Sequence, residues 1–307
     1  MNTPQVVPRR RPSFLKGIIA CLTLWMGLVL QPGFAAITVV SDSFADGERS
    51  TQNLPNSAAW YQLGSATGTV SSTTGYTISP STAGNAFIAV SYFTPTTVTI
   101  GASITLSFSV TDTITPGAAS ARQGLRFGLF NSNGVTPGNN SLTGDTTTLT
   151  NSAFTHYTGY AGFYSLQSAL DPSGIAISQR DGVSPALTNS LFGGTSYSTL
   201  GALSGSTAAA SGTTYNVSLT LQYVSATEMD ITLIANGNTV TRTTSSILST
   251  FDSIGLFSSG SNGDVTFDNI TVTVVPEPST VSLLALACFC AIAISRERRR
   301  KGAPVLA

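Results

Sequence analysis

Hydrophobic and polar residues alternate with a period of two through most of this chain. Residues 104–110 alternate apolar side chains with serine and threonine, and residues 215–223 repeat the pattern. Successive side chains of a strand point to opposite faces, so each segment is predicted to be a strand with one buried face. Shorter apolar runs predict further strands at 37–40, 87–90, 125–129, 160–166, 175–177 and 254–257.

Two local features predict how strands turn and pair. A strand over residues 229–233 leads into Asn236-Gly237, a pair that suits a type I′ hairpin turn. In the last strand the apolar positions change phase between Phe267 and Ile270, which predicts a β-bulge near Asp268-Asn269. No helical pattern in this region is long enough for a parallel crossover.

We therefore predict an all-β fold, a single antiparallel β-sandwich over residues 36–275. Short motifs at Asp42-Ser43-Phe44, Trp60-Tyr61, Phe251–Leu256 and Phe267–Ile270 resemble concanavalin A-like or laminin G-like jelly-roll domains. The resemblance implies that the first and last strands lie close together. In many relatives it also implies a glycan-binding or calcium site.

The N-terminus has the pattern of a signal peptide over residues 1–35. A basic region through Lys16 precedes an apolar region, 17–30, and a small-residue cleavage site. Cleavage after Ala35 places small residues at both selective positions, whereas cleavage after Ala36 would place Phe34 at one of them. Residues 10–16 also resemble a twin-arginine export motif with one residue too many, although the apolar region suits the general secretory route better.

The C-terminus combines three elements in a fixed order. Pro276, Glu277 and Pro278 predict an exposed, extended peptide because proline fixes φ and restricts the residue before it. An apolar run, 281–294, predicts a membrane helix, since 17 residues from 279 to 295 span about 25 Å. A basic cluster then stops transfer and marks the cytoplasmic side, followed by a cytoplasmic extension over residues 302–307. The cluster consists of Arg296, Arg298, Arg299, Arg300 and Lys301.

This order of elements over residues 276–301 resembles the PEP-CTERM sorting signal. The resemblance implies recognition by an exosortase-type membrane protease in a bacterium with an outer membrane. It implies transient insertion in the inner membrane, then delivery to the cell surface or an exopolysaccharide matrix. An ordinary C-terminal membrane anchor is the alternative for the same residues.

The overall formal charge of zero hides an acidic core. Nine of the fourteen cations lie in the two terminal segments, and five arginines minus twelve acids gives −7 for residues 36–275. Such a charge disfavours nucleic acid and anionic lipid as partners. The core has no cysteine and only one histidine, His156, so neither a disulfide nor a Cys/His metal site is expected there.

No catalytic motif is complete. Glu228-Met229-Asp230 begins a pattern that some jelly-roll glycoside hydrolases carry, but Leu233 stands where the second glutamate belongs. A nucleophilic triad would have to use His156, and the core lacks a Gly-x-Ser-x-Gly elbow. We therefore expect no enzymatic activity, no catalytic residues and no bound cofactor.

Two binding hypotheses remain beside plain structural roles. Tyr157, Tyr160 and Tyr164, or Trp60 and Tyr61, would form a glycan platform if exposed, although core packing explains the same rings. Calcium would need oxygen ligands from both ends of the core, and solvated turn acids are the alternative. The candidate acids are Asp42, Asp46, Glu48, Asp264 and Asp268.

The sequence thus favours an exported structural or glycan-binding β-sandwich sorted by its tail. A carbohydrate-active jelly-roll enzyme and a permanently anchored periplasmic protein are the alternatives.

Overall fold

A computed structural model of the protein describes the β-rich middle of the chain. The described residues are 35–79, 86–113, 124–136, 148–165, 174–181, 190–193, 197–203, 210–259 and 263–277. The chain divides into two units, Met1–Ala35 and Ala36–Ala307, and only Ala35 of the first is described. The predicted signal peptide before Ala35, Pro278, the tail helix and the basic cluster lie outside the described residues.

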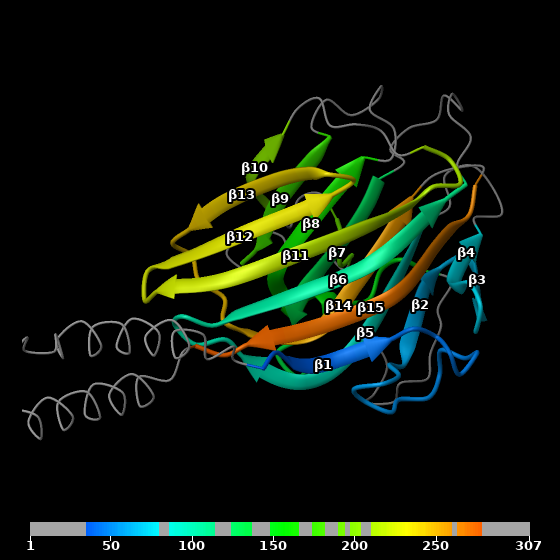
Figure 1. The fold of residues 1–307 in the computed structure, drawn as a ribbon, viewed down its shortest axis with the longest axis horizontal. Coiled ribbons are helices and arrows are strands. Elements are labelled where there is room, and N and C mark those ends of the chain that lie inside the picture. The colour runs from blue at the N-terminus through cyan, green and yellow to red at the C-terminus, as the bar shows by residue number, and fades with distance from the viewer. Residues whose placement is uncertain are drawn as a thin grey trace, which may run out of the picture. The chain divides into compact units, whose positions relative to one another are not determined.

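Two antiparallel sheets form the second unit, as predicted (Figure 1). The first sheet has the order β13-β12-β11-β6-β15-β4-β3, and β1 pairs with β15 along the edge opposite to β6. Its strands are β1 (Ile37–Asp42), β3 (Thr67–Ser71), β4 (Gly75–Ser79), β6 (Ser103–Asp112), β11 (Thr214–Ser225), β12 (Glu228–Ala235), β13 (Asn238–Thr244) and β15 (Val265–Val275).

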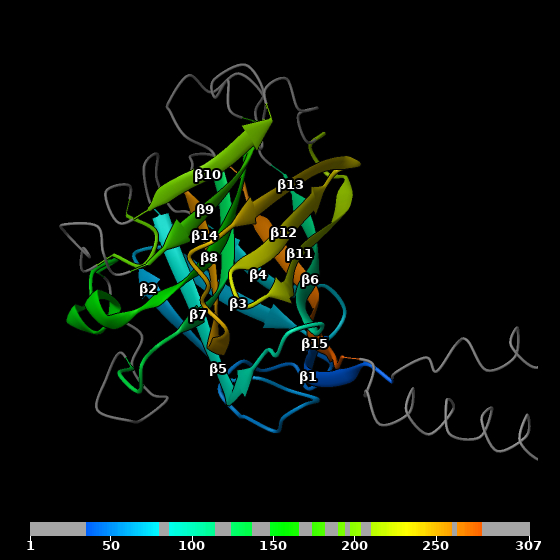
Figure 2. The ribbon, with the colours of Figure 1, turned by 90° about the vertical axis from the view of Figure 1, so that its left-hand side faces the viewer.

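The second sheet has the order β10-β9-β8-β7-β14-β5-β2 (Figure 2). Its strands are β2 (Trp60–Gly64), β5 (Ala86–Thr97), β7 (Gly124–Asn131), β8 (Thr158–Ser165), β9 (Ile175–Arg180), β10 (Ser198–Leu203) and β14 (Thr250–Ser259). Every pairing between these named strands is antiparallel. The only helix in the described part is one 3₁₀ turn, η1 (Ser152–His156).

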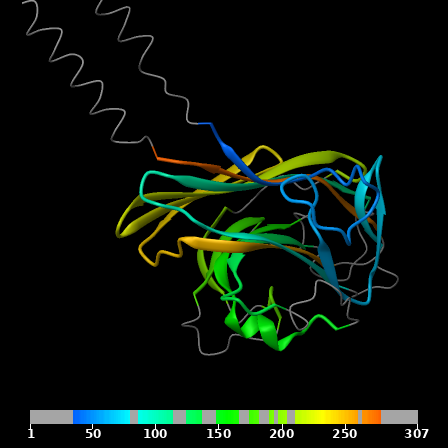
Figure 3. The same cartoon turned by 90° about the horizontal axis from the view of Figure 1, so that it is seen from below.

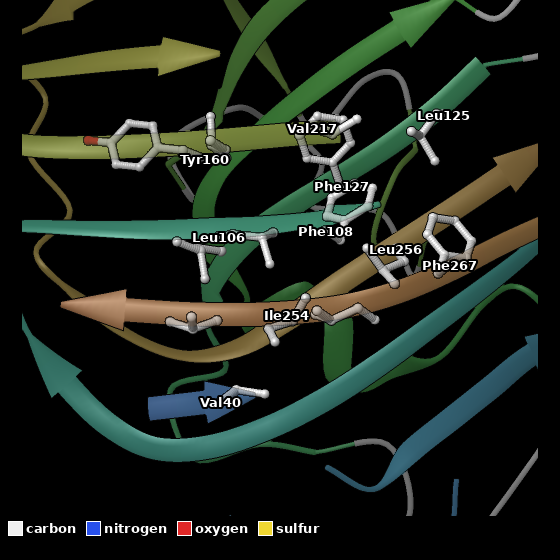
Figure 4. Packing of buried hydrophobic residues seen from close by; sticks show 14 of the residues in the cluster. Val40, Leu106, Phe108, Leu125, Phe127, Tyr160, Val217, Ile254, Leu256 and Phe267 are labelled. Atoms are coloured by element: carbon white, nitrogen blue, oxygen red, sulfur yellow. The ribbon is translucent and has the colours of Figure 1, made fainter. Parts of the chain in front are cut away.

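The main core lies between the two sheets, where the alternating residues of β6 and β11 point inward. Figure 4 shows Leu106, Phe108, Phe127 and Phe267 packed together from both sheets. The Phe108 ring lies 5.1 Å from that of Phe127 and 5.7 Å from that of Phe267, in edge-on and tilted geometries that favour aromatic pairs. Tyr160 belongs to the same core.

Several strands of the second sheet, such as β2, β9 and the first half of β5, are buried on both faces. Its outer face carries a smaller apolar cluster that includes Ile88, Val90 and Phe257, against which η1 and residues 190–193 pack. Figure 3 shows η1 on the side of this sheet away from the first sheet. Continuous apolar runs such as 86–90 are typical of strands that are covered on both sides.

The predicted local features are confirmed. Asn236 and Gly237 both have positive φ, at 47° and 72°, as a type I′ turn requires. The pairing of β15 with β6 shifts between Asp268 and Thr271, and Asn269 has a φ of 51°, so the predicted bulge is present. Strands β1 and β15 pair directly, which brings the two ends of the sandwich chain together.

The two opening motifs also meet in space. Asp42 accepts hydrogen bonds from the backbone N–H groups of Phe44 and Ala58 and from Trp60 Nε1, the last at 2.8 Å. Trp60 lies on the core face of β2 and its ring centroid is 6.3 Å from that of Phe44. Asp42, the last residue of β1, therefore connects the first sheet to β2 of the second sheet.

Candidate functional site

The two predicted processing points flank one pair of hydrogen-bonded strands. Ile37 of β1 is paired with Val274 of β15, and β15 ends one residue later. Ala35 and Ala36 are exposed and lie before β1. Pro276 is half-buried and Glu277 exposed, and neither belongs to a strand. Cuts after Ala35 and near Glu277 would therefore leave every described strand intact.

Glu277 lies against a tight turn at Gly101. Gly101 has a φ of 87°, and a Cβ placed on it would come within 2.9 Å of Glu277 Cβ. The Gly101 N–H donates to the Tyr223 carbonyl at 2.7 Å, so this turn is fixed to the end of β11. Glycine at this position allows the segment after β15 to lie close to the turn.

The predicted aromatic glycan platform is wrong for all five rings. Trp60, Tyr61, Tyr157, Tyr160 and Tyr164 are each 3% exposed or less. Tyr160 and Tyr164 point into the main core. Tyr157 lies on the outer face of the second sheet, beneath the loop that carries η1. Packing, the alternative considered for these rings, is what the structure shows.

Two arginines bind the segments that cover this outer face, which are η1 and residues 190–193. The sequence analysis did not single out either arginine. Arg180 is fully buried and donates to the carbonyls of Phe154, Tyr157, Ser190 and Leu191. Burial lowers the pKa of its guanidinium. Arg126 donates to the Phe192 carbonyl and lies over the Phe163 and Phe257 rings. Their position on strands within apolar runs is the only sequence feature that could have drawn attention to them.

A polar network is buried under the same cover. The Tyr92 and Tyr157 hydroxyls lie 2.6 Å apart, and burial raises the pKa of both phenols. Asp252 accepts hydrogen bonds from the Ser132 N–H and hydroxyl at 2.8 and 2.7 Å. The contacts of Asp252 connect the loop after β7 to β14, so they stabilise the position of that loop on the second sheet.

The acids considered for calcium are not gathered into one site. Burial raises the pKa of Asp42, whose carboxylate already accepts three hydrogen bonds. Asp46 accepts hydrogen bonds from the Ser57 hydroxyl and the Glu48 N–H. Asp264 lies directly before the first residue of β15. Within the described ranges, no group of three or more His, Cys, Asp or Glu side chains is placed to hold a metal.

The incomplete hydrolase motif lies on the outer side of β12. Glu228 is exposed, Asp230 is half-buried, and Met229, Ile231 and Leu233 point into the core. Asp230 accepts a hydrogen bond from the Thr243 hydroxyl at 2.5 Å. Glu228 and Asp230 therefore lie on the solvent-facing side of a strand whose other side is buried.

The outer face of the first sheet carries ordered rows of hydroxyl groups. The strand registers align five threonines across β15, β6, β11, β12 and β13, which are Thr273, Thr105, Thr220, Thr232 and Thr241. Neighbouring strands lie about 4.8 Å apart, so the row is regularly spaced. Thr105 and Thr220 are 3.0 Å apart between hydroxyls, and Thr232 and Thr241 are 3.2 Å apart.

Further hydroxyl pairs extend this surface along the strands. Ser107 and Thr271 lie 2.7 Å apart, and so do Thr111 and Thr214. None of the four described arginines lies on this face, because Arg126 and Arg180 belong to the second sheet, Arg49 lies before β2, and Arg242 alternates with outward threonines on β13. We call these rows the hydroxyl face; it comprises Thr105, Ser107, Ser109, Thr111, Thr214, Ser218, Thr220, Thr232, Thr239, Thr241, Thr271 and Thr273.

Comparison with known proteins gives similarity of structure only. No protein-family model matches the chain, and no curated protein matches it. Among solved structures, the Emp47p carbohydrate recognition domain is 8% identical over 78% of this chain and 95% of its own, with a TM-score of 0.46. Basic winged bean lectin with Tn-antigen is 13% identical over 78% and 97%, with a TM-score of 0.43.

An alginate lyase, Aly36B, is also similar, in a mutant form complexed with alginate trisaccharide. It is 14% identical over 76% of this chain and 97% of its own, with a TM-score of 0.40. At such identities and scores neither a ligand nor a reaction follows for this chain. No helix among the described residues is both long and apolar enough to cross a membrane.

Proposed function

We propose that this protein is an exported β-sandwich that a C-terminal tail sorts to the cell surface or an exopolysaccharide matrix. Cleavage after Ala35 removes the leader, and the tail holds the protein in the inner membrane. An exosortase-type protease then acts at Pro276-Glu277-Pro278 and releases the sandwich. The main support is that both processing points lie just outside the paired strands β1 and β15.

At its destination the protein serves as a structural component that contacts neutral glycans through the hydroxyl face. Threonine and serine hydroxyls both donate and accept hydrogen bonds, which matches the hydroxyl groups of sugars. The face carries none of the described arginines, and the −7 charge of residues 36–275 repels acidic polysaccharides. Neutral polysaccharide is therefore the favoured ligand class.

Co-sedimentation of the released protein with insoluble cellulose, and separately with covalently cross-linked, calcium-free alginate beads, tests this contact. We expect retention on cellulose and little on alginate. Thr220→Ala combined with Thr232→Ala should weaken retention about fivefold, as expected from losing about 1 kcal/mol of hydrogen bonding. Thr97→Ala with Thr250→Ala is the matched control, because that hydroxyl pair, 3.1 Å apart, lies on the second sheet. Equal retention of both double variants would mean that the hydroxyl face does not bind the glycan.

A carbohydrate-active enzyme is the second candidate, favoured only by the acidic composition of the core. It requires two convergent acids, and Asp42 and Asp252 already accept hydrogen bonds from neighbouring backbone and side-chain groups. Release of reducing sugar from cellulose or alginate by the purified protein would favour this candidate over a non-enzymatic role.

A further inference from the structure

Exposed aliphatic side chains gather at one end of the sandwich. The described part has six large exposed apolar side chains, and four of them lie at this end. Ile37 is 57% exposed, Ile100 44%, Val224 41% and Val275 40%. We call these four residues the aliphatic end. Single exposed apolar residues are ordinary, whereas several at one end of a domain make that end a candidate for contact with an apolar partner.

Strand register and turn contacts place the four residues at the same end of the first sheet, with Ile37 on the side of Val274 and Val275 on the opposite side. Ile37 begins β1 opposite Val274, and Val275 ends β15 opposite Ser103. Ile100 precedes the turn whose Gly101 N–H donates to the Tyr223 carbonyl, next to Val224. Figure 1 shows the start of β1, the end of β15, the start of β6 and the end of β11 at the same end of the first sheet.

The sequence after Glu277 fixes what lies near this end. Residues 278–307 follow, and their apolar run begins at Val281, four residues after Glu277. Four extended residues reach at most about 14 Å. If that run crosses the membrane, as the proposed function holds, Glu277 must lie within this distance of the lipid surface, and both the Gly101 turn and the end of β15 lie next to Glu277.

The charge at this end is suited to neutral lipid. Glu277 is the charged residue next to Gly101, and Glu228 lies beyond the turn after Val224. Of the four described arginines, Arg126 and Arg180 belong to the second sheet and Arg49 lies before β2. Arg242 is level with Ile37 in the strand register but lies on β13, four strands from β15 and about 19 Å away, so β1, β15 and the Gly101 turn carry no described cation for anionic headgroups. A few aliphatic side chains bind lipid weakly by themselves, but a tether keeps them at high effective concentration.

We propose that the aliphatic end rests on the zwitterionic surface of the membrane while the tail anchors the uncleaved protein. This contact rests on the proposed anchoring and goes beyond it, because it orients the sandwich and holds Pro276-Glu277 at the level of the headgroups. Cleavage of the tail then releases a weak contact that the sandwich cannot maintain alone.

Tryptophan quenching by acyl-brominated phosphatidylcholine tests the contact directly. The protein is expressed in a host without an exosortase, purified in its membrane-bound form, and placed in nanodiscs. Cleavage of the leader removes Trp25, so buried Trp60 is the constant background. Ile100→Trp should be quenched at least about twofold more than Ile234→Trp, since Ile234 is similarly exposed, at 41%, but lies within β12. Val224→Trp is the second reporter if Ile100→Trp does not fold.

The outcomes separate the contact from the anchoring. Loss of the protein from the discs would overturn both the tail anchor and the contact. Retention in the discs with equal quenching at residues 100 and 234 would overturn the contact and leave the anchor standing. Protection of Ile100→Trp from aqueous iodide without lipid quenching would point to a protein partner and would also overturn the contact.

Discussion

Arg180 binds both of the segments that cover the outer face of the second sheet. Its guanidinium donates to four backbone carbonyls in two separate segments, so one side chain fixes both. Removing it leaves those buried acceptors without their charged donor. Because each such loss costs about 1–3 kcal/mol, Arg180→Ala should lower the free energy of unfolding by about 3 kcal/mol or more.

Urea unfolding of Arg180→Ala beside Arg242→Ala measures this effect. Arg242 is half-buried and bridges Thr241 and Ala202 at the strand edge, so its loss should cost about 1 kcal/mol or less. Similar costs for the two variants would mean that the buried guanidinium does not fix the cover.

Buried tyrosines should make the protein sensitive to alkali. Burial raises the pKa of Tyr160 to about 12, and raises those of Tyr92, Tyr157 and Tyr197 as well. Above pH 10 the unfolded chain loses phenolic protons that the folded chain keeps, so the free energy of unfolding falls as pH rises. The loss is about 1.4 kcal/mol per pH unit for each such tyrosine.

Denaturant unfolding between pH 9 and 11.5, with tyrosinate absorbance recorded alongside, checks this dependence. Tyrosinate from these residues should appear only as the protein unfolds, and Tyr160→Phe should make the decline shallower. Full ionisation of the tyrosines near pH 10 in a protein that remains folded would contradict the account.

At the scale of elements, the β12–β13 hairpin depends on its turn residues. Gly237 has a φ of 72°, and a Cβ there would meet no atom within 4 Å. The cost of Gly237→Ala is therefore one of backbone conformation alone, about 1–2 kcal/mol. Thermal unfolding measures it, with exposed Thr239→Ala in the same hairpin as control. A thermally neutral Gly237→Ala would argue against the type I′ turn.

Elements with one buried face could be predicted from the sequence, because burial on one side imposes alternation. β6, β11 and β12 follow this rule closely. β3 and β10 could not be predicted, since their small and polar residues are half-buried or exposed and carry no apolar pattern. Their pairing with β4 and β9 defines them instead.

Candidate sites that form only when the chain folds could not be predicted from the sequence either. The two processing points are predicted from contiguous motifs, and they stay predictions because no described contact tests cleavage at either of them. The burial of Tyr157 could not, since it depends on a loop that folds over the second sheet. The hydroxyl face was also missed, because its five-threonine row exists only across five strands brought together by register.

At the scale of the whole molecule, the described chain starts and ends on neighbouring strands. The proposed sorting therefore acts at one end of the sandwich, away from the registers that hold the two sheets together. Glu277→Ala should leave the protein in the inner membrane, because the exposed carboxylate is proposed as part of the motif that the protease reads. Cell fractionation measures this, with exposed Glu228→Ala as the matched control. Unchanged surface delivery of Glu277→Ala would count against exosortase recognition.

Intact-mass spectrometry of the protein isolated from the cell surface tests the central claim most directly. We expect a chain that begins at Ala36 and ends close to Glu277. A surface-located chain that still ends at Ala307 would contradict it.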